Sequence, residues 1–296
     1  MKLGIGLPES LPYGLSRTLL LDWARLADLA GFHTIAVRDR PCYDMWDPLL
    51  TLAAVAAVTE RARLATTVLQ LPIRNAIMVA KQAAVIDRLS DGRFDLGIGL
   101  GSRQDDYAVY GATMEHRITR YRDQLGEIRG LWATALRTTT REFGPVGPAP
   151  VQEPGPPIWL GAQLTNEAGL RRAVELGDGY VFGSAAEPEE MAPVVRKVRE
   201  WAIEAGKNSF TINRIAQVAV GGRRSLDEAI IQTRRYYPGG TARPVEDLIK
   251  HGDPEVIGAW VRRNAEIGVD LTILMPVVPE IGQVEQLAET VLPEYR

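Results

Sequence analysis

The sequence predicts an α/β fold, a (β/α)8 TIM barrel with short insertions. The chain has 296 residues, which suits one barrel of roughly 250 residues plus insertions. Eight short apolar runs with strand character recur along the chain, and amphipathic runs with helical spacing lie between them. Strict alternation of strands and helices implies a parallel sheet, and eight strands are enough to close it into a barrel.

The strands are predicted where apolar, β-branched residues form short runs bounded by polar residues or glycine. Most residues in these runs are apolar and they do not alternate strictly with polar ones, which is typical of parallel strands that are covered on both faces. In chain order the runs cover residues 2–7, 34–38, 63–69, 94–99, 157–161, 179–183, 211–220 and 270–275.

The helices are predicted where apolar residues recur at intervals of three and four. Their starts carry local signals: Asp47 and Asp253 each precede a proline and can cap a helix, and Ser225 with Glu228 has the spacing of a capping box. The amphipathic runs cover residues 17–30, 48–60, 76–89, 117–134, 165–177, 188–206, 226–236 and 283–292.

Two segments lie outside this minimal repeat. Residues 137–156, which follow the fourth helix, are rich in Thr, Gly and Pro, and residues 237–260, after the seventh strand, include an extra helix that starts after Asp253. Neither segment is long or apolar enough to bury a core of its own. We therefore expect one barrel domain over residues 1–296, with both segments as insertions.

Composition limits the classes of function. An apolar content of 46%, a charged content of 24% and a net charge of −3 are ordinary for a globular enzyme and argue against nucleic acid as a partner. The single cysteine, Cys42, excludes an intramolecular disulfide, and His33, His116 and His251 lack metal-ligand spacing. No uncharged run approaches the ~18 residues of a membrane span. We expect a cytoplasmic enzyme with no bound metal and no membrane association.

The loops that follow the strands are the expected place for reactive groups, because they converge at one end of a barrel. The third strand ends at Leu69, before a loop broken by Pro72, and the fourth ends in Gly97, Gly99 and Gly101. Glycines there let a planar ligand approach the backbone. The sequence therefore predicts a cofactor ring near the ends of these two strands.

Several segments, in this order, resemble the bacterial luciferase-like superfamily. They are Leu-Ala-Thr-Thr-Val-Leu at 64–69, residues 81–93, Gly-Ile-Gly-Leu-Gly at 97–101, residues 117–132, Pro-Pro-Ile-Trp-Leu-Gly-Ala at 156–162 and Leu-Gly-Asp-Gly-Tyr-Val at 176–181. The resemblance covers most of the chain outside the insertions. It implies a barrel that binds reduced flavin mononucleotide (FMN) or the deazaflavin coenzyme F420.

The resemblance also implies which residues hold the cofactor. It places a non-proline cis peptide at Thr67–Val68, where a bulge lies behind the ring, and a hydrogen bond from Asp39 to the ring. It places the phosphate between the fifth and sixth strands, at backbone N–H groups and helix N-termini, rather than at the glycine pair 221–222. The expected cofactor-binding residues are Asp39, Thr66, Thr67, Val68, Gly101, Gly161, Ala162, Gln163, Phe182, Gly183 and Ser184.

The catalytic residues depart from the pattern of related F420 sugar-phosphate dehydrogenases. Arg40 stands where those enzymes have a histidine, and Ser102 stands where they have a glutamate. Arginine stays protonated and shuttles protons poorly, so sugar-phosphate oxidation is not expected. The catalytic candidates are Asp39, Arg103 and Asp105, and the candidates for substrate binding are Tyr43, Trp46, Tyr107 and Tyr110.

We therefore expect an oxidoreductase that transfers a hydride between F420 and a small organic substrate. One alternative is an FMNH2-dependent luciferase-like monooxygenase supplied by a partner reductase. Another is a flavin-binding protein that has lost catalysis, as the residues at 40 and 102 allow. The expected partners are the small-molecule substrate, a flavin or F420 reductase and a second copy of the chain. The apolar runs 53–58 and 76–85 could pack across subunits, but they equally suit helices that lie against the barrel.

Overall fold

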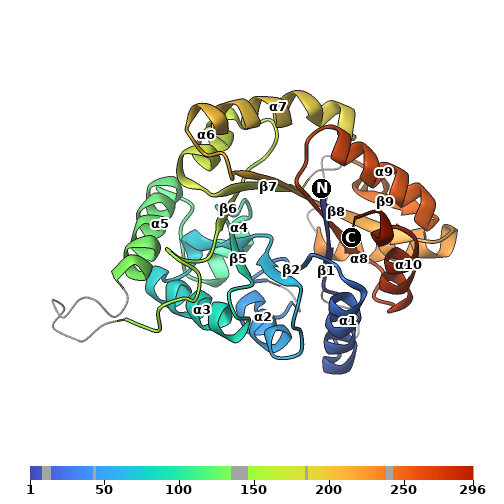
Figure 1. Ribbon diagram of the computed structural model, residues 1–296, viewed down its shortest axis with the longest axis horizontal. Coiled ribbons are helices and arrows are strands. Elements are labelled where there is room, and N and C mark those ends of the chain that lie inside the picture. The colour runs from blue at the N-terminus through green and yellow to red at the C-terminus, as the bar shows by residue number, and fades with distance from the viewer. Residues whose placement is uncertain (9–14, 43–44, 135–145, 184–185, 238–242, 296) are drawn as a thin grey trace.

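The computed structural model describes residues 1–8, 15–42, 45–134, 146–183, 186–237 and 243–295. Helices surround a central sheet of parallel strands, and the first and last strands lie side by side (Figure 1). The sheet closes because β8 (Thr211–Val220) also pairs with β10 (Leu271–Pro276). The predicted (β/α)8 barrel is confirmed.

All eight predicted strands are present in the barrel, with ends shifted by at most three residues. The fourth, the sixth and the seventh keep their predicted bounds. The barrel strands are β1 (Lys2–Gly6), β2 (Thr34–Val37), β3 (Arg63–Thr66), β5 (Phe94–Gly99), β6 (Ile158–Gly161), β7 (Gly179–Gly183), β8 and β10. Inside the cylinder, Trp159, Val181 and Met275 belong to one buried apolar cluster that fills its interior.

The third predicted strand divides in two. β3 ends at Thr66, and β4 (Leu69–Gln70) resumes the pairing with β5 after two further residues. The peptide bond between Thr67 and Val68 is cis, as the resemblance implied. The chain then turns through η1 (Leu71–Ile73) toward the next helix.

Eight helices form the outer ring, each with its apolar side on the sheet. In α1, for example, Leu20, Trp23, Ala24 and Ala27 are buried at helical spacing, and the Trp23 indole donates to the Gly6 carbonyl at 3.0 Å. The ring comprises α1 (Arg17–Ala30), α2 (Pro48–Ala56), α3 (Ala76–Leu89), α5 (Arg117–Thr134), α6 (Glu167–Leu176), α7 (Pro188–Glu204), α9 (Pro254–Glu266) and α10 (Gly282–Thr290).

The structure reverses the predicted roles of two helices. The helix predicted as the extra one, α9, packs between α7 and α10 in the ring (Figure 1). The helix predicted for the ring, α8 (Arg223–Tyr236), instead packs on β8, η2 (Val245–Leu248) and β9 (Ile249–Gly252). β8 continues past the last residue that pairs with β7, and β9 pairs with this extension. The second insertion is therefore α8, η2 and β9.

Two of the three predicted helix caps are not formed. Asp47 accepts hydrogen bonds from the backbone N–H groups of Leu49 and Leu50, as predicted. Asp253 precedes α9 but makes no cap hydrogen bond with its side chain. α8 already begins at Arg223, so Ser225 lies inside the first turn and forms no capping box.

The described part of the first insertion, residues 146–156, has no regular secondary structure and packs near the end of α3, where Asp87 accepts from the backbone of Val151 and Gln152. Among the helices that the structure describes, none is both long and apolar enough to cross a lipid bilayer. The remaining short elements are α4 (Gln104–Val109) and η3 (Leu292–Tyr295).

Candidate functional site

A hollow lies at the carboxyl ends of the barrel strands. Its central cavity has a volume of about 430 Å³, and an adjoining cavity over β5, β6 and β7 has a volume of about 350 Å³. Both are lined by Thr67, Val68, Gly101, Ser102, Gln163, Gly183 and Ile215, so they form one continuous space. This is the end of the barrel at which the sequence predicts the cofactor.

Val68 forms the floor of this hollow, and glycines on the neighbouring strands make room for it. A Cβ atom at Gly99 would lie 2.6 Å from Val68 Cγ2, and one at Gly161 would lie 3.1 Å from the same atom. Beneath the floor, Thr66 is fully buried and donates through Oγ1 to the Gly97 carbonyl at 2.7 Å. Thr67 and Val68 thus face the hollow, whereas Thr66 lies below it.

Asp39 lines the central cavity and is 6% exposed. Its carboxylate accepts from the Gln70 backbone N–H at 2.8 Å and from Arg74 Nη2 at 3.0 Å. Arg74 also bonds Asp47 at 3.0 Å, which fixes the guanidinium between two carboxylates. Burial raises the pKa of the Asp39 carboxyl, and the Arg74 charge opposes that rise.

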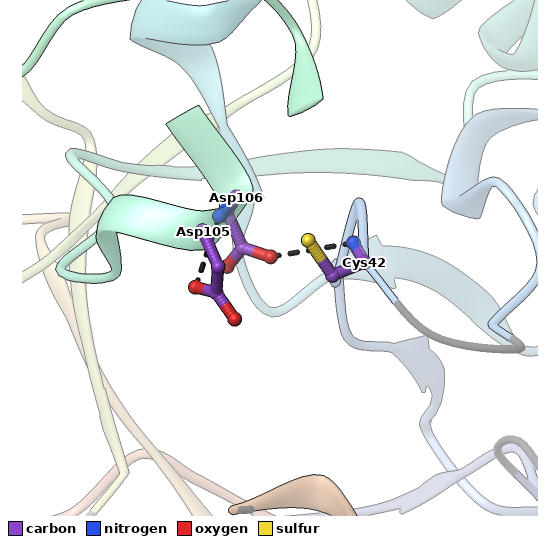
Figure 2. A group of neighbouring side chains, drawn as sticks. All are labelled: Cys42, Asp105 and Asp106. Atoms are coloured by element: carbon purple, nitrogen blue, oxygen red, sulfur yellow. Dashed lines mark hydrogen bonds between the residues drawn. The ribbon is translucent and has the colours of Figure 1, made fainter. Parts of the chain in front are cut away.

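Asp106 is the centre of a second polar network beside the cavity, and Figure 2 shows it with Cys42 and Asp105. Its carboxylate accepts from Arg40 Nε at 3.2 Å, from the Cys42 backbone N–H at 3.3 Å and from Gln70 Nε2 at 3.0 Å. Arg40 also reaches Asp105 at 3.4 Å.

Ligand atoms of Cys42, Asp105 and Asp106 lie within 4.8 Å of one another, a spacing that could suit a metal ion. However, Arg40 already supplies the positive charge between the two carboxylates. Burial and the adjacent Asp106 raise the pKa of the Cys42 thiol, which favours the protonated form rather than the thiolate that binds metals. We interpret the cluster as a hydrogen-bond network.

This network sets the orientation of the Gln70 amide. Its Nε2 donates to Asp106 and, at 3.4 Å, to the Asp39 carbonyl, so Oε1 points the other way, toward Gly101. A Cβ at Gly101 would lie only 2.3 Å from Oε1, and Gly101 has a φ of +70°. Gly101 is therefore required by both its backbone conformation and its contact with Gln70.

The adjoining cavity has a cationic lining. Gly161, Ala162, Gln163, Phe182 and Gly183 line it together with Arg117, Asn166 and Arg172. Within the described residues, neither arginine has a side-chain hydrogen bond or an ion pair. The start of α6 faces the same region, with Asn166 as its N-cap. These are features of a phosphate site. Ser184 lies outside the described residues.

The second insertion covers the mouth of the central cavity. Tyr236 and Tyr237, at the end of α8, line the cavity, and Arg40 and Arg103 donate to the Tyr236 carbonyl at 2.9 and 3.0 Å. The guanidinium carbons of Arg38, Arg40 and Arg103 lie 4.1, 5.3 and 5.1 Å from the centre of the Tyr236 ring. Residues from three distant segments thus meet over the hollow.

The structure separates the other predicted site residues. Tyr107 is buried and donates its hydroxyl to the Leu100 carbonyl, while Trp46 and Tyr110 are 41% and 46% exposed. None of these three lines either cavity. Arg103 lines the central cavity, whereas Asp105 lies at its edge in contact with Arg40. Tyr43 lies outside the described residues.

Lining residues that sequence reasoning did not single out include Arg38, Arg117, Arg172, Gln217 and Tyr236. Gln70 begins a loop that the loop rule selects, although the pattern assigned it no role, and Arg38 ends a predicted strand, so the same rule could have included it. No sequence signal places Tyr236 at the cavity, because the pattern predicts its helix in the outer ring.

Comparison with known proteins gives one family. The model of the luciferase-like monooxygenase family matches residues 7–293. An uncharacterized protein of Mycobacterium tuberculosis is 36% identical over 141 residues, 46% of this chain and 49% of that protein, so the chain spans about half the length of this relative. A second uncharacterized protein of this species is 34% identical over 227 residues, 67% of this chain and 77% of that protein.

Two relatives have activities in their names. The 5,10-methylenetetrahydromethanopterin reductase of Methanolobus tindarius is 28% identical over 237 residues, 79% of this chain and 68% of that protein. The oxygenase component of the flavin-dependent trigonelline monooxygenase of Acinetobacter baylyi is 28% identical over 162 residues, 50% of this chain and 43% of that protein.

Solved structures share the fold. The monooxygenase RslO1 of Streptomyces bottropensis has a TM-score of 0.76 at 23% identity and covers 100% of both chains. An F420-dependent secondary alcohol dehydrogenase in complex with an F420-acetone adduct has a TM-score of 0.79 at 17% identity, and the match covers 100% of this chain and 99% of that one. Since the family model matches the chain from residue 7 to residue 293, the chain belongs to the luciferase-like monooxygenase family.

Proposed function

We propose that this oxidoreductase transfers a hydride between coenzyme F420 and a small organic substrate. The observation that carries the proposal is the continuous hollow, which has a flat floor at Val68 and, beyond it, a cationic end at Arg117 and Arg172. This arrangement fits a planar ring joined to a phosphate. When bound, the deazaflavin supplies the carbon that gives or takes the hydride.

The chain's own residues position the coenzyme in this proposal. Thr67, Val68 and Gly101 support the ring, and each Asp39 oxygen keeps a lone pair that can accept a hydrogen bond from it. Backbone N–H groups at Gly161–Gln163 and Gly183 hold the phosphate with the two arginines. Ser184 stays a prediction for the same role.

Arg40 takes no part in proton transfer in this proposal. Its guanidinium is held by Asp106, Asp105 and the Tyr236 carbonyl, and arginine stays protonated in proteins. Arg103 lines the cavity and would orient the substrate. Asp105, half-exposed at the mouth, is the candidate for exchanging a proton with solvent.

Parallel titrations of the purified apoprotein with F420 and with FMN test the cofactor. We expect F420 to bind with micromolar or tighter affinity and FMN to bind at least tenfold more weakly, as read from the spectrum of each coenzyme. Tight binding of FMN with no binding of F420 would reverse the assignment, and binding of neither would reject both cofactors.

A second candidate is an FMNH2-dependent monooxygenase that receives reduced flavin from a partner reductase. Arg40 and Ser102 stand where the resemblance implies the histidine and glutamate of F420 sugar-phosphate dehydrogenases, which weakens the case for F420. The similarity to a monooxygenase oxygenase component supports this second candidate. Two assays separate the candidates. A monooxygenase would consume oxygen in the presence of reduced FMN, whereas an F420-dependent enzyme would convert its substrate with reduced F420 in the absence of oxygen.

We also propose that two copies of the chain associate through α2 and α3. These neighbouring helices carry exposed apolar side chains at Leu50, Met78, Val85 and Leu89. Sedimentation equilibrium would report a dimer, and the Leu50→Glu and Met78→Glu substitutions would shift it toward monomer.

A further inference from the structure

Both carboxylates that line the central cavity are already paired with an arginine. The lining contains Arg38, Arg40 and Arg103 but only two carboxylates, Asp39 and Asp106. Asp39 is already paired with Arg74, and Asp106 is paired with Arg40. The carboxylates of the lining are therefore both engaged, and Arg103 has no ion-pair partner among the described residues.

Arg103 is held with its guanidinium at the cavity. One N–H donates to the Tyr236 carbonyl at 3.0 Å, and the group stacks 5.1 Å from the Tyr236 ring centre and 4.7 Å from that of Tyr237. A guanidinium has five N–H donors, and this contact uses one. The remaining donors can bind both oxygens of a carboxylate, the geometry for which arginine is suited.

A second polar group in the lining also lacks a partner. Gln217, on β8, is 9% exposed and lines the same cavity, and its Nε2 has no acceptor among the described residues. Burying an amide N–H without an acceptor is unfavourable. In the barrel, β8 is three strands away from β5, whose loop carries Arg103, so the two groups approach the cavity from different sides.

We propose that the substrate is a small organic carboxylate with a second oxygen. Its carboxylate pairs with Arg103, and its carbonyl or hydroxyl oxygen accepts a hydrogen bond from Gln217 Nε2. This inference rests on the proposed function, because it assigns the substrate of the same hollow. The carboxylates of a coenzyme tail share this chemistry, so the experiment must separate the two sources.

The test compares a carboxylate with a neutral molecule of the same shape. Binding of 4-fluoromandelate and of its neutral amide, 4-fluoromandelamide, both of which carry a hydroxyl as the second oxygen, is measured by fluorine NMR on wild type, Arg103→Gln, Arg103→Lys and Gln217→Leu, with and without F420. Arg61→Gln, at an exposed arginine before β3, serves as the matched control. F420 affinity and the melting temperature are measured for every variant.

We expect wild type and Arg61→Gln to bind the mandelate at least tenfold more tightly than the mandelamide. Arg103→Gln should lose this preference, Arg103→Lys should keep part of it, and Gln217→Leu should weaken both probes about equally. The F420 affinity of all variants should stay within twofold of wild type.

Equal binding of both probes to wild type, or an unchanged preference in folded Arg103→Gln, overturns the inference. A tenfold loss of F420 affinity in Arg103→Gln with unchanged mandelate binding assigns the arginine to the coenzyme and also overturns it. If neither F420 nor FMN binds but the Arg103-dependent preference persists, the proposed function fails while the carboxylate site stands.

Discussion

Arg40 and Asp106 form a buried ion pair at the mouth of the barrel. Arg40 Nε lies 3.2 Å from the carboxylate, and the two side chains are 2% and 1% exposed. The pair joins the loop after β2 to α4, which follows β5, and it also fixes the amide of Gln70. At this position, where the resemblance to F420 sugar-phosphate dehydrogenases implies a histidine, the chain thus has an arginine held by ion pairs.

Removing one member of this pair should destabilise the fold. Asp106→Asn leaves the buried Arg40 without its main counter-charge, and we expect the free energy of unfolding to fall by about 3 kcal/mol. Asp105→Asn, whose side chain is 46% exposed, should cost less than about 1 kcal/mol. Urea unfolding of both variants measures the difference, and equal losses would contradict the assigned roles.

Gly99 should be essential for coenzyme binding. In Gly99→Ala the new methyl group would lie 2.6 Å from Val68 Cγ2 and push Val68 into the hollow. We expect coenzyme affinity to fall at least tenfold. Gly126→Ala is the control, because a Cβ there meets no atom within 4 Å.

The double variant Gly99→Ala/Val68→Ala should recover part of the lost affinity, because it restores the space that the methyl group takes. No recovery in a folded double variant would show that Gly99 acts by some means other than its contact with Val68. The affinities come from F420 and FMN titrations of all four proteins.

Arg117 and Arg172 should act on the phosphate alone. A charge-assisted hydrogen bond contributes about 1.5 to 3 kcal/mol, so Arg117→Gln and Arg172→Gln should each weaken FMN binding by tenfold or more. Riboflavin has the same ring without the phosphate, and its affinity should not change. A parallel loss of riboflavin affinity would place these arginines at the ring instead.

His33 should make the protein less stable in mild acid. Burial, with the charges of Lys2 and Arg63, lowers its pKa to about 4, whereas histidine in an unfolded chain titrates near about 6.5. As the pH falls through this interval, His33 is protonated in the unfolded chain but stays neutral in the folded protein. The unfolded state is therefore favoured, and the free energy of unfolding decreases.

Because His33 is only partly buried, we expect this loss to be about 1 to 2 kcal/mol between pH 7 and pH 4. His33→Gln should lose correspondingly less over the same interval. Urea unfolding at the two pH values measures the slopes, and proton NMR of the His33 ring reports its pKa directly. Identical slopes in both proteins would remove His33 as the cause.

Local patterns were enough to predict the elements of this fold. Continuous apolar runs such as 179–183 mark strands covered on both faces, and the spacing of Leu20, Trp23 and Ala27 marks a helix with one buried side. The order of the motifs carries the family resemblance, which predicted the cis peptide at Thr67–Val68. That prediction identified the segment that forms the floor of the hollow.

By itself, then, the sequence determined the barrel, its strands and the segment on which a ring would lie. Only the tertiary structure decided that α9 rather than α8 completes the ring, that Tyr236 covers the cavity, and that Tyr107 turns into the protein. The physical reason is that periodicity reports that one side of an element is buried but not which neighbour buries it. Contacts such as Arg103 with Tyr236, 133 residues apart, exist only after the chain has folded.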